Sequence, residues 1–347
     1  MDMKCTFDDM DNINLGAGIF GGIVAYSGLI LYNTYKIHRD AEIKNVSELK
    51  VYEIKQRQTE LRYEKEKIEY DILLEFLTQL KEKLPNCDYT NLNNNLSSLE
   101  IKKLIIPGGV YFGRLNKVVA PKIAPKAEKR IATFHELLHM SSAFYDENRK
   151  ILFVGFRQST VEKNSSIGRG LNEGYTVLLT ERLFESEREK LKIKEKESYH
   201  FCKFYAEKLE QIVGQDKMQN LYFKSDLLGL IKEIESYDTK QSILEFINTL
   251  DFMEKNYFKN DIMSASLFSR EIIIANIDHI QQCLIKWYFR KLKRQEMPFD
   301  EIKNSLLEYS RSLNDNLLIK SEVKKELEKN INLEVEMLLT SIESKIK

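Results

Sequence analysis

The chain has 347 residues, 43% of them hydrophobic and 31% charged, so it can bury a sizeable core and is not a disordered chain. Lysine and arginine balance aspartate and glutamate at 53 each, and this absence of a basic surplus excludes nucleic acid from the expected partners. The four cysteines stand far apart and form no CxxC pair, which argues against a disulfide framework and a cysteine-based zinc site.

An uncharged segment near the N-terminus predicts a membrane-spanning helix. Residues 15–32 are almost continuously apolar, and about 20 such residues cross a bilayer as a helix. Gly18 and Gly22 form a GxxxG pair, which would let two such helices approach closely as a homodimer. A glycine-rich buried hairpin is the alternative. Acidic residues precede the segment while Lys36 and Arg39 follow it, so the positive-inside rule predicts a single-pass protein with its C-terminal bulk in the cytoplasm.

The next segments predict a long helix and a small sheet. Residues 46–84 carry apolar side chains at spacings of three, four and seven, and Pro85 ends this predicted helix. Residues 104–113 indicate two short strands around a Pro-Gly-Gly turn. Val118 and Val119 are expected to extend the same sheet.

Two helices separated by a strand and a polar loop come next. The first begins at Pro125 and runs to about Tyr145, and the second covers 171–184. Between them, 151–156 predicts a strand, either an edge strand that pairs with an extended peptide or plain core structure. A loop rich in serine, asparagine and glycine is expected over 159–170. Apolar spacing then predicts helices over 183–213, 227–250, 272–292 and 301–347.

The segment from His135 to His139 reads His-Glu-Leu-Leu-His, an HExxH motif. Residues four apart share one face of a helix, so both imidazoles can reach a single ion. Glu136 lies one step round, where it can act as general base toward a water on zinc. A chance match is the alternative, but burying two histidines and a glutamate without partners is costly.

A third ligand for one zinc ion per chain is expected from the second helix. Catalytic zinc sites use three protein ligands and one open position. Glu173 falls in the first turn of the helix predicted from Leu171, and the neighbouring Gly174 would allow the two helices to approach closely. The alternative is a glutamate favoured only by the helix dipole.

HELLH followed by Leu-Asn-Glu-Gly-Tyr-Thr resembles the gluzincin clan of zinc peptidases over about residues 131–184, and its Asn-Glu-Gly-aromatic step is similar to that of the aminopeptidase N type. The resemblance implies a zincin-like core with the third ligand, Glu173, on the next helix. Two departures favour an endopeptidase, or a divergent family within the clan, over an aminopeptidase: the gap from His139 to Glu173 is longer, and the Gly-x-Met-Glu-Asn motif of those aminopeptidases is absent.

The resemblance also raises the question of which groups support the ligands and the transition state. Many gluzincins carry an aspartate four residues after the ligand glutamate, and Val177 stands there in this chain. Thr176 or Asn172 is expected to substitute. Tyr175 is the predicted catalytic donor to the developing oxyanion. Two other candidates for that role stay open, namely Tyr145 and His200. For all three residues the alternative is an ordinary packing or surface role.

We therefore expect an α+β, predominantly helical protein: a zincin-like core with a small sheet, an N-terminal transmembrane helix and a C-terminal helical domain. The expected divisions are an acidic tail and anchor over 1–35, a helical stalk over 36–100, the catalytic core over 101–190 and the helical domain over 191–347. The expected activity is zinc-dependent hydrolysis of a peptide or protein substrate. The alternative is a non-enzymatic, membrane-tethered helical interaction protein.

Overall fold

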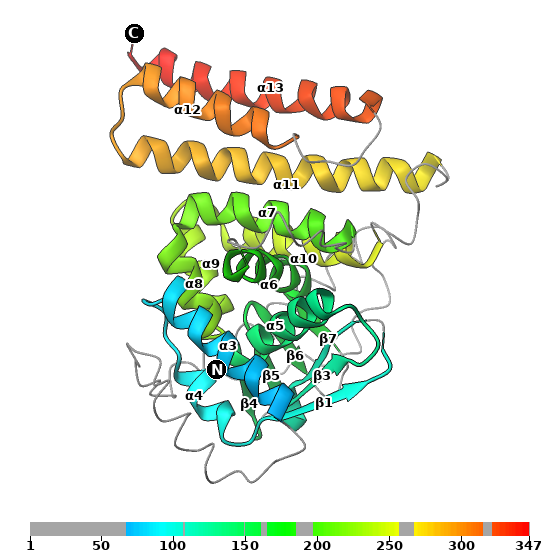
Figure 1. Cartoon of the computed structure of the whole chain (residues 1–347). Coiled ribbons are helices and arrows are strands. Elements are labelled where there is room, and N and C mark those ends of the chain that lie inside the picture. The colour runs from blue at the N-terminus through cyan, green and yellow to red at the C-terminus, as the bar shows by residue number, and fades with distance from the viewer. Residues whose placement is uncertain are drawn as a thin grey trace, which may run out of the picture. The chain divides into compact units, whose positions relative to one another are not determined.

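Helices make up most of the protein, and two small sheets lie beside helix α5 (Figure 1). The computed structural model describes residues 67–106, 108–148, 150–160, 165–184, 197–256, 267–314 and 321–346. Within these residues, none of the helices is both long enough and apolar enough to cross a membrane. The predicted span at 15–32, its GxxxG pair and the first part of the predicted stalk lie outside them.

The first described helices are α3 (Lys67–Lys83), α4 (Thr90–Leu96), α5 (Lys126–Ser142) and α6 (Arg169–Leu183). As predicted, α3 ends just before Pro85. The helix predicted to reach Tyr145 instead ends at Ser142, because the chain turns into an extended strand at Ala143, where ψ is 137°. Tyr145 therefore lies on a strand and not on a helix.

The three-stranded sheet contains β1 (Glu100–Leu104), β2 (Val110–Phe112) and β3 (Lys117–Pro121). The two strands predicted around the Pro-Gly-Gly turn exist, but they do not pair with each other. Instead β3 lies between them, parallel to β1 and antiparallel to β2. Val118 and Val119 are buried on this central strand, which leaves β2 as an edge strand.

The second sheet has four antiparallel strands in sequence order: β4 (Ala143–Asp146), β5 (Ile151–Val154), β6 (Arg157–Thr160) and β7 (Ser165–Ile167). The edge-strand role considered for 151–156 is wrong, because β5 is paired on both sides. The loop predicted over 159–170 is also partly wrong. Its polar sequence hides two strands, whose register pairs the buried Gln158 with the buried Ile167.

The remaining helices are α7 (Glu197–Val213), α8 (Gln215–Phe223), α9 (Leu227–Glu235), α10 (Lys240–Asn256), α11 (Leu267–Arg294), α12 (Phe299–Ser312) and α13 (Ser321–Ile346). The helix predicted over 227–250 is two helices. Asp238 stabilises the break, because its carboxylate accepts hydrogen bonds from the Thr239 amide at 2.8 Å and the Trp287 indole at 2.9 Å. The segment predicted over 301–347 is likewise divided between α12 and α13.

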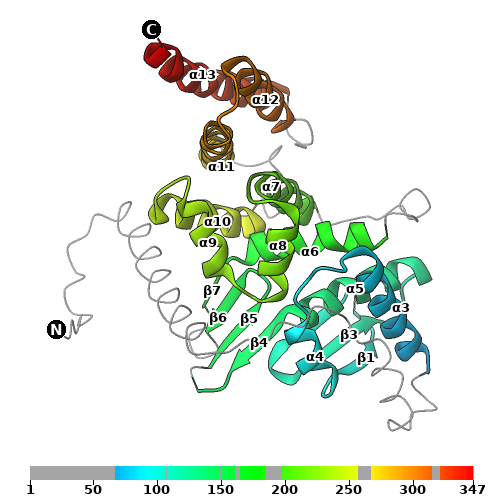
Figure 2. The ribbon, with the colours of Figure 1, turned by 90° about the vertical axis from the view of Figure 1, so that its left-hand side faces the viewer.

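The helices α7 and α10 connect the strand-bearing part of the fold to the last helices. The helix α6 packs along α7 and against α10, and Figure 2 shows α11, α12 and α13 beyond α7 and α10, away from both sheets. The helix α6 belongs to the expected catalytic core and α7 to the expected C-terminal helical domain. These two expected domains therefore share an extensive packing contact.

Gly174 is a point of very close approach between α6 and another helix. A Cβ atom at this position would lie 2.3 Å from the carbonyl carbon of Cys202 and 2.6 Å from the amide nitrogen of Lys203, both in the backbone of α7. The small residue therefore permits close contact with α7, a different helix from the one that carries His135.

We expect Gly174→Ala to lower the free energy of unfolding by about 1–3 kcal/mol, because the added methyl group has no room against the α7 backbone. Urea denaturation followed by circular dichroism measures this loss. Gly108→Ala is the control, since a Cβ atom there meets nothing within 4 Å. Equal stability of the Gly174→Ala variant and the wild type would show that α6 and α7 are not this tightly packed.

Candidate metal centre

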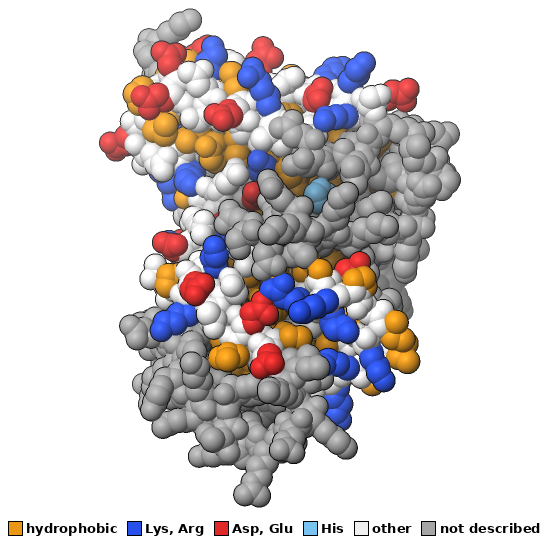
Figure 3. Space-filling view, in the orientation of Figure 1, with side chains coloured by type: hydrophobic (Ala, Val, Ile, Leu, Met, Phe, Trp, Pro, Cys, Tyr) orange, Lys and Arg blue, Asp and Glu red, His pale blue; other side chains and the backbone are white. Residues whose placement is uncertain are grey.

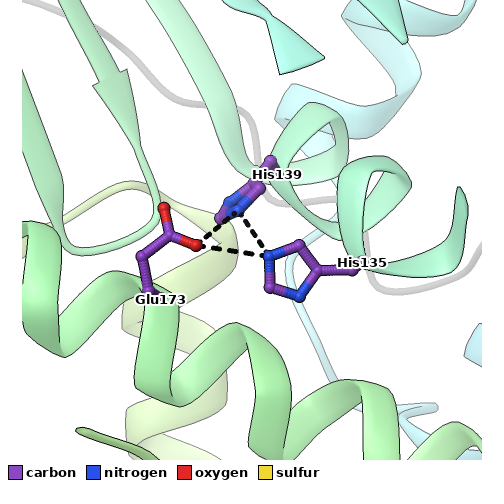
Figure 4. A group of neighbouring side chains, drawn as sticks. All are labelled: His135, His139 and Glu173. Atoms are coloured by element: carbon purple, nitrogen blue, oxygen red, sulfur yellow. Dashed lines mark hydrogen bonds and ion pairs between the residues drawn. The ribbon is translucent and has the colours of Figure 1, made fainter. Parts of the chain in front are cut away.

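The structure brings the three predicted ligands together from two helices (Figure 4). His135 and His139 lie one turn apart on α5 and present their Nε2 atoms on the same side. Glu173 faces them from α6. This helix begins at Arg169, two residues before the predicted start, so Glu173 lies in its second turn and not in its first.

The separations of the three donor atoms suit a tetrahedral metal ion. The Nε2 atoms of His135 and His139 are 3.1 Å apart, and Oε2 of Glu173 lies 3.3 Å from the first and 3.5 Å from the second. A tetrahedral zinc ion with its usual bond lengths places such ligand atoms about 3.4 Å apart. Two imidazoles and one carboxylate are also one of the donor sets known for catalytic zinc sites.

The carboxyl group of Glu173 is held in its ionised form. Burial by itself would raise its pKa, but the charge of His139 and the hydrogen bonds from both histidines outweigh burial and hold the pKa well below the usual value. The side chains of all three residues are largely buried, with His135 the most accessible at 14%. A buried cluster of this kind gains from a cation that all three donors share.

Both residues predicted to support the ligands lie behind His139, but only Thr176 can accept its N–H. Oγ1 of Thr176 lies 3.5 Å from Nδ1 of His139, whereas the Asn172 amide nitrogen, 3.3 Å from the same atom, can only donate. Thr176 donates to the carbonyl of Asn172 at 2.7 Å, and its hydroxyl lies 2.8 Å from that of Tyr222. The contact with Thr176 orients His139, the second histidine of the motif. In many gluzincins an aspartate orients the first histidine, so the supporting contact was expected at His135.

His135 instead contacts a residue that the sequence did not indicate. The ring of Tyr199, in the first turn of α7, lies nearly parallel to the His135 ring with centroids 6.1 Å apart. Burial, followed by the charge of Glu173, raises the pKa of Tyr199, so its phenol stays protonated at neutral pH. Its hydroxyl bonds with Arg169, which forms an ion pair with Glu254 at 3.1 Å.

The N-terminus of α6 is capped by a carboxylate from a distant part of the chain. Asp251, on α10, accepts the Gly170 amide at 2.7 Å through Oδ1 and the Gly168 amide at 2.8 Å through Oδ2. Burial raises the pKa of Asp251 to about 7, although the two amides lower it in part. Since Gly168 offers no side-chain cap of its own, Asp251 fixes the start of the helix at Arg169, four residues before Glu173. No local sequence signal indicated this contact.

Glu136 lies beside the first sheet. Its side chain is buried, and a Cβ atom on Gly109 would stand 2.5 Å from its Cγ atom and 3.0 Å from its Oε1 atom. The backbone that enters the edge strand β2 therefore passes directly over the predicted general base.

The structure does not bring Tyr175 to the ligand cluster. Its hydroxyl donates to Oε1 of Glu210 at 2.6 Å within the core, and burial together with Glu210 raises its pKa well above the usual value. Tyr145 lies under the guanidinium of Arg114. His200 follows Tyr199 on α7, and burial with the charge of Lys203 lowers its pKa. Tyr175 therefore does not have the position that an oxyanion donor needs, whereas the ring of Tyr199 lies against that of His135.

The chain matches none of the protein-family models, curated proteins or solved structures with which it was compared. The interpretation of the site therefore depends on the geometry and chemistry of its own residues.

Thr176→Val is expected to weaken metal binding about 10–100-fold, because Nδ1 of His139 loses an oxygen partner while the shape of the side chain is preserved. Competition with a metal-binding dye measures the affinity. Thr180→Val is the matched control. Thr180 is buried one turn further along α6, and its hydroxyl donates to the Thr176 carbonyl at 2.7 Å. Equal loss in both variants would mean that the effect comes from the helix and not from His139.

Proposed function

We propose that this protein is a metal-dependent peptidase that binds zinc through His135, His139 and Glu173. The observation that carries the proposal is the convergence of two Nε2 atoms and one carboxylate oxygen within 3.5 Å of one another. The HExxH spacing adds a glutamate, Glu136, beside that cluster. A zinc ion held by these residues supplies a Lewis acid that polarises a carbonyl and lowers the pKa of water.

The edge strand β2 supports a peptide as the substrate. Among the described strands it pairs with β3 alone, so its outer side presents backbone groups to an added strand. Val110 and Phe112 stand on it with 39% and 47% of their surfaces exposed, available to contact alternate side chains of an extended chain. Because β2 starts one residue after Gly109, a peptide paired with it would run past Glu136.

The residues around the cluster have distinct roles in this proposal. Glu136 accepts the proton of the attacking water and passes it to the leaving amine. The phenol of Tyr199 donates a hydrogen bond to the oxyanion that develops on the peptide carbonyl. Because a guanidinium can only donate, the phenol oxygen is the acceptor in its bond with Arg169, and its O–H group is a donor.

Two substitutions are expected to separate metal binding from hydrolysis. Wild-type protein should contain about one zinc ion per chain, and His135→Ala should lose it. Glu136→Gln should keep the metal, since Glu136 is not a ligand, but lower kcat about 10²–10⁴-fold. Elemental analysis and cleavage of a fluorogenic peptide library measure the two effects.

Chelation provides the control for the first variant, because it should lower the melting temperature of the wild type and leave that of His135→Ala unchanged. A wild-type protein that binds no metal, or a Glu136→Gln variant that still cleaves peptides, would contradict the proposal. The first result would favour the helical interaction protein instead.

Tyr199→Phe should lower kcat about 10²–10³-fold with little change in KM, because it removes a donor to the oxyanion and keeps the ring against His135. Tyr205→Phe is the control: this residue is buried in the same helix, and its hydroxyl accepts from Gln281. Peptide kinetics at constant metal content measure both. If the two variants have the same activity, Tyr199 has no catalytic role.

A further inference from the structure

Two neighbouring loops at one end of the three-stranded sheet expose large aliphatic side chains. Ile105 follows β1 and Ile123 follows β3, with 73% and 75% of their surfaces exposed, and Leu104 is 49% exposed. The two strands are parallel, so both loops leave the same end of the sheet. The Lys122 amide donates to the Leu104 carbonyl at 2.7 Å, which holds the loops side by side. We call this group of residues, 103–105 and 122–126, the loop patch.

Single exposed aliphatic residues are common on protein surfaces, but three that adjoin one another are not. These side chains protrude from loop ends, and Lys122 and Pro125 beside them are exposed as well. A protruding set of branched aliphatic side chains is suited to enter a soft apolar layer.

Positive charge surrounds the loop patch. Residues 100–130 contain eight lysine and arginine residues and only two glutamates. One of these, Glu100, stands at the opposite end of β1 and pairs with Lys102 at 2.6 Å and with Lys117 at 3.5 Å. Figure 3 shows lysine and arginine side chains gathered beside hydrophobic ones over the region that holds β1, β3 and α5 in Figure 1. The lysines at or next to the loop patch are Lys103, Lys122, Lys126 and Lys129.

We propose that the loop patch docks on an anionic lipid surface, with Ile105 and Ile123 inserted among the headgroups and the lysines against the lipid phosphates. Apolar side chains that insert into the interface and basic residues that meet anionic headgroups are the two elements of interfacial membrane binding. The lysines and the aliphatic tips share one end of the sheet, so a flat surface can meet both at once. This contact does not require the peptidase activity, and it would be a second one besides the predicted span at 15–32.

The test uses the full chain with Cys5→Ser and Ile123→Cys, labelled with an environment-sensitive fluorophore. Cys87, Cys202 and Cys283 are buried and stay unlabelled. In vesicles of phosphatidylcholine mixed with phosphatidylglycerol, the emission should shift to the blue and be quenched by brominated lipid. It should do neither in pure phosphatidylcholine or at high salt. A label at Met337→Cys on α13, an exposed position, should not respond.

Lys122→Gln with Lys126→Gln should lower the ratio of docked to undocked protein about 25-fold, because each lysine near an anionic surface contributes about a factor of five. The matched control neutralises two exposed lysines of α13, Lys325 and Lys329, and should change nothing. An unquenched label at position 123 in anionic vesicles would overturn the proposal, and so would equal quenching in neutral lipid. A blue shift caused by polyglutamate but not by vesicles would overturn it in favour of an acidic protein partner.

Discussion

The structure depends on the approach of α5 and α6, which places two imidazole nitrogens and a carboxylate oxygen between 3.1 and 3.5 Å apart. Polar groups buried this closely cost free energy unless each has a partner. A cation shared by all three satisfies them together, whereas hydrogen bonds among the three satisfy them only in part, since a neutral imidazole has a single N–H group. The geometry thus favours a metal ion over a simple network of hydrogen bonds.

The position of Glu173 is maintained by residues from the C-terminal half of the chain. Asp251 on α10 holds the first amides of α6, and Gly174 brings the same helix against α7. Tyr222 on α8 reaches the hydroxyl that supports His139. The helices α7, α8 and α10 therefore help to build the site, because they determine where the third donor stands. A metal ion bound to that donor would in turn stabilise their packing.

Sequence patterns predicted the features that depend on the spacing of nearby residues. The features that the patterns missed depend on contacts between distant parts of the chain. His135 and His139 share a face because they are four residues apart in a helix, and Glu173 follows in the next helix. The pairing of β1 with β3 was missed, because a parallel pair is not encoded in the turn between β1 and β2. Polar residues such as Gln158 concealed β6, since tertiary burial overrides strand propensity. Tyr199 lies on a segment whose spacing predicted only a helix, so nothing distinguished it from a packing residue.

The helix α5 relates the loop patch to the candidate metal centre. Its first residue, Lys126, is the last residue of the loop patch, and His135 follows nine residues later, about 14 Å along a helix. If the loop patch lies on a bilayer, this length of α5 sets an upper limit on the distance between the lipid surface and the metal centre. An extended chain advances about 3.3 Å per residue, so about four residues would bridge that gap. The two proposals together favour substrates cut close to a membrane surface, because a peptide on the edge strand β2 would then enter from the side of the lipid.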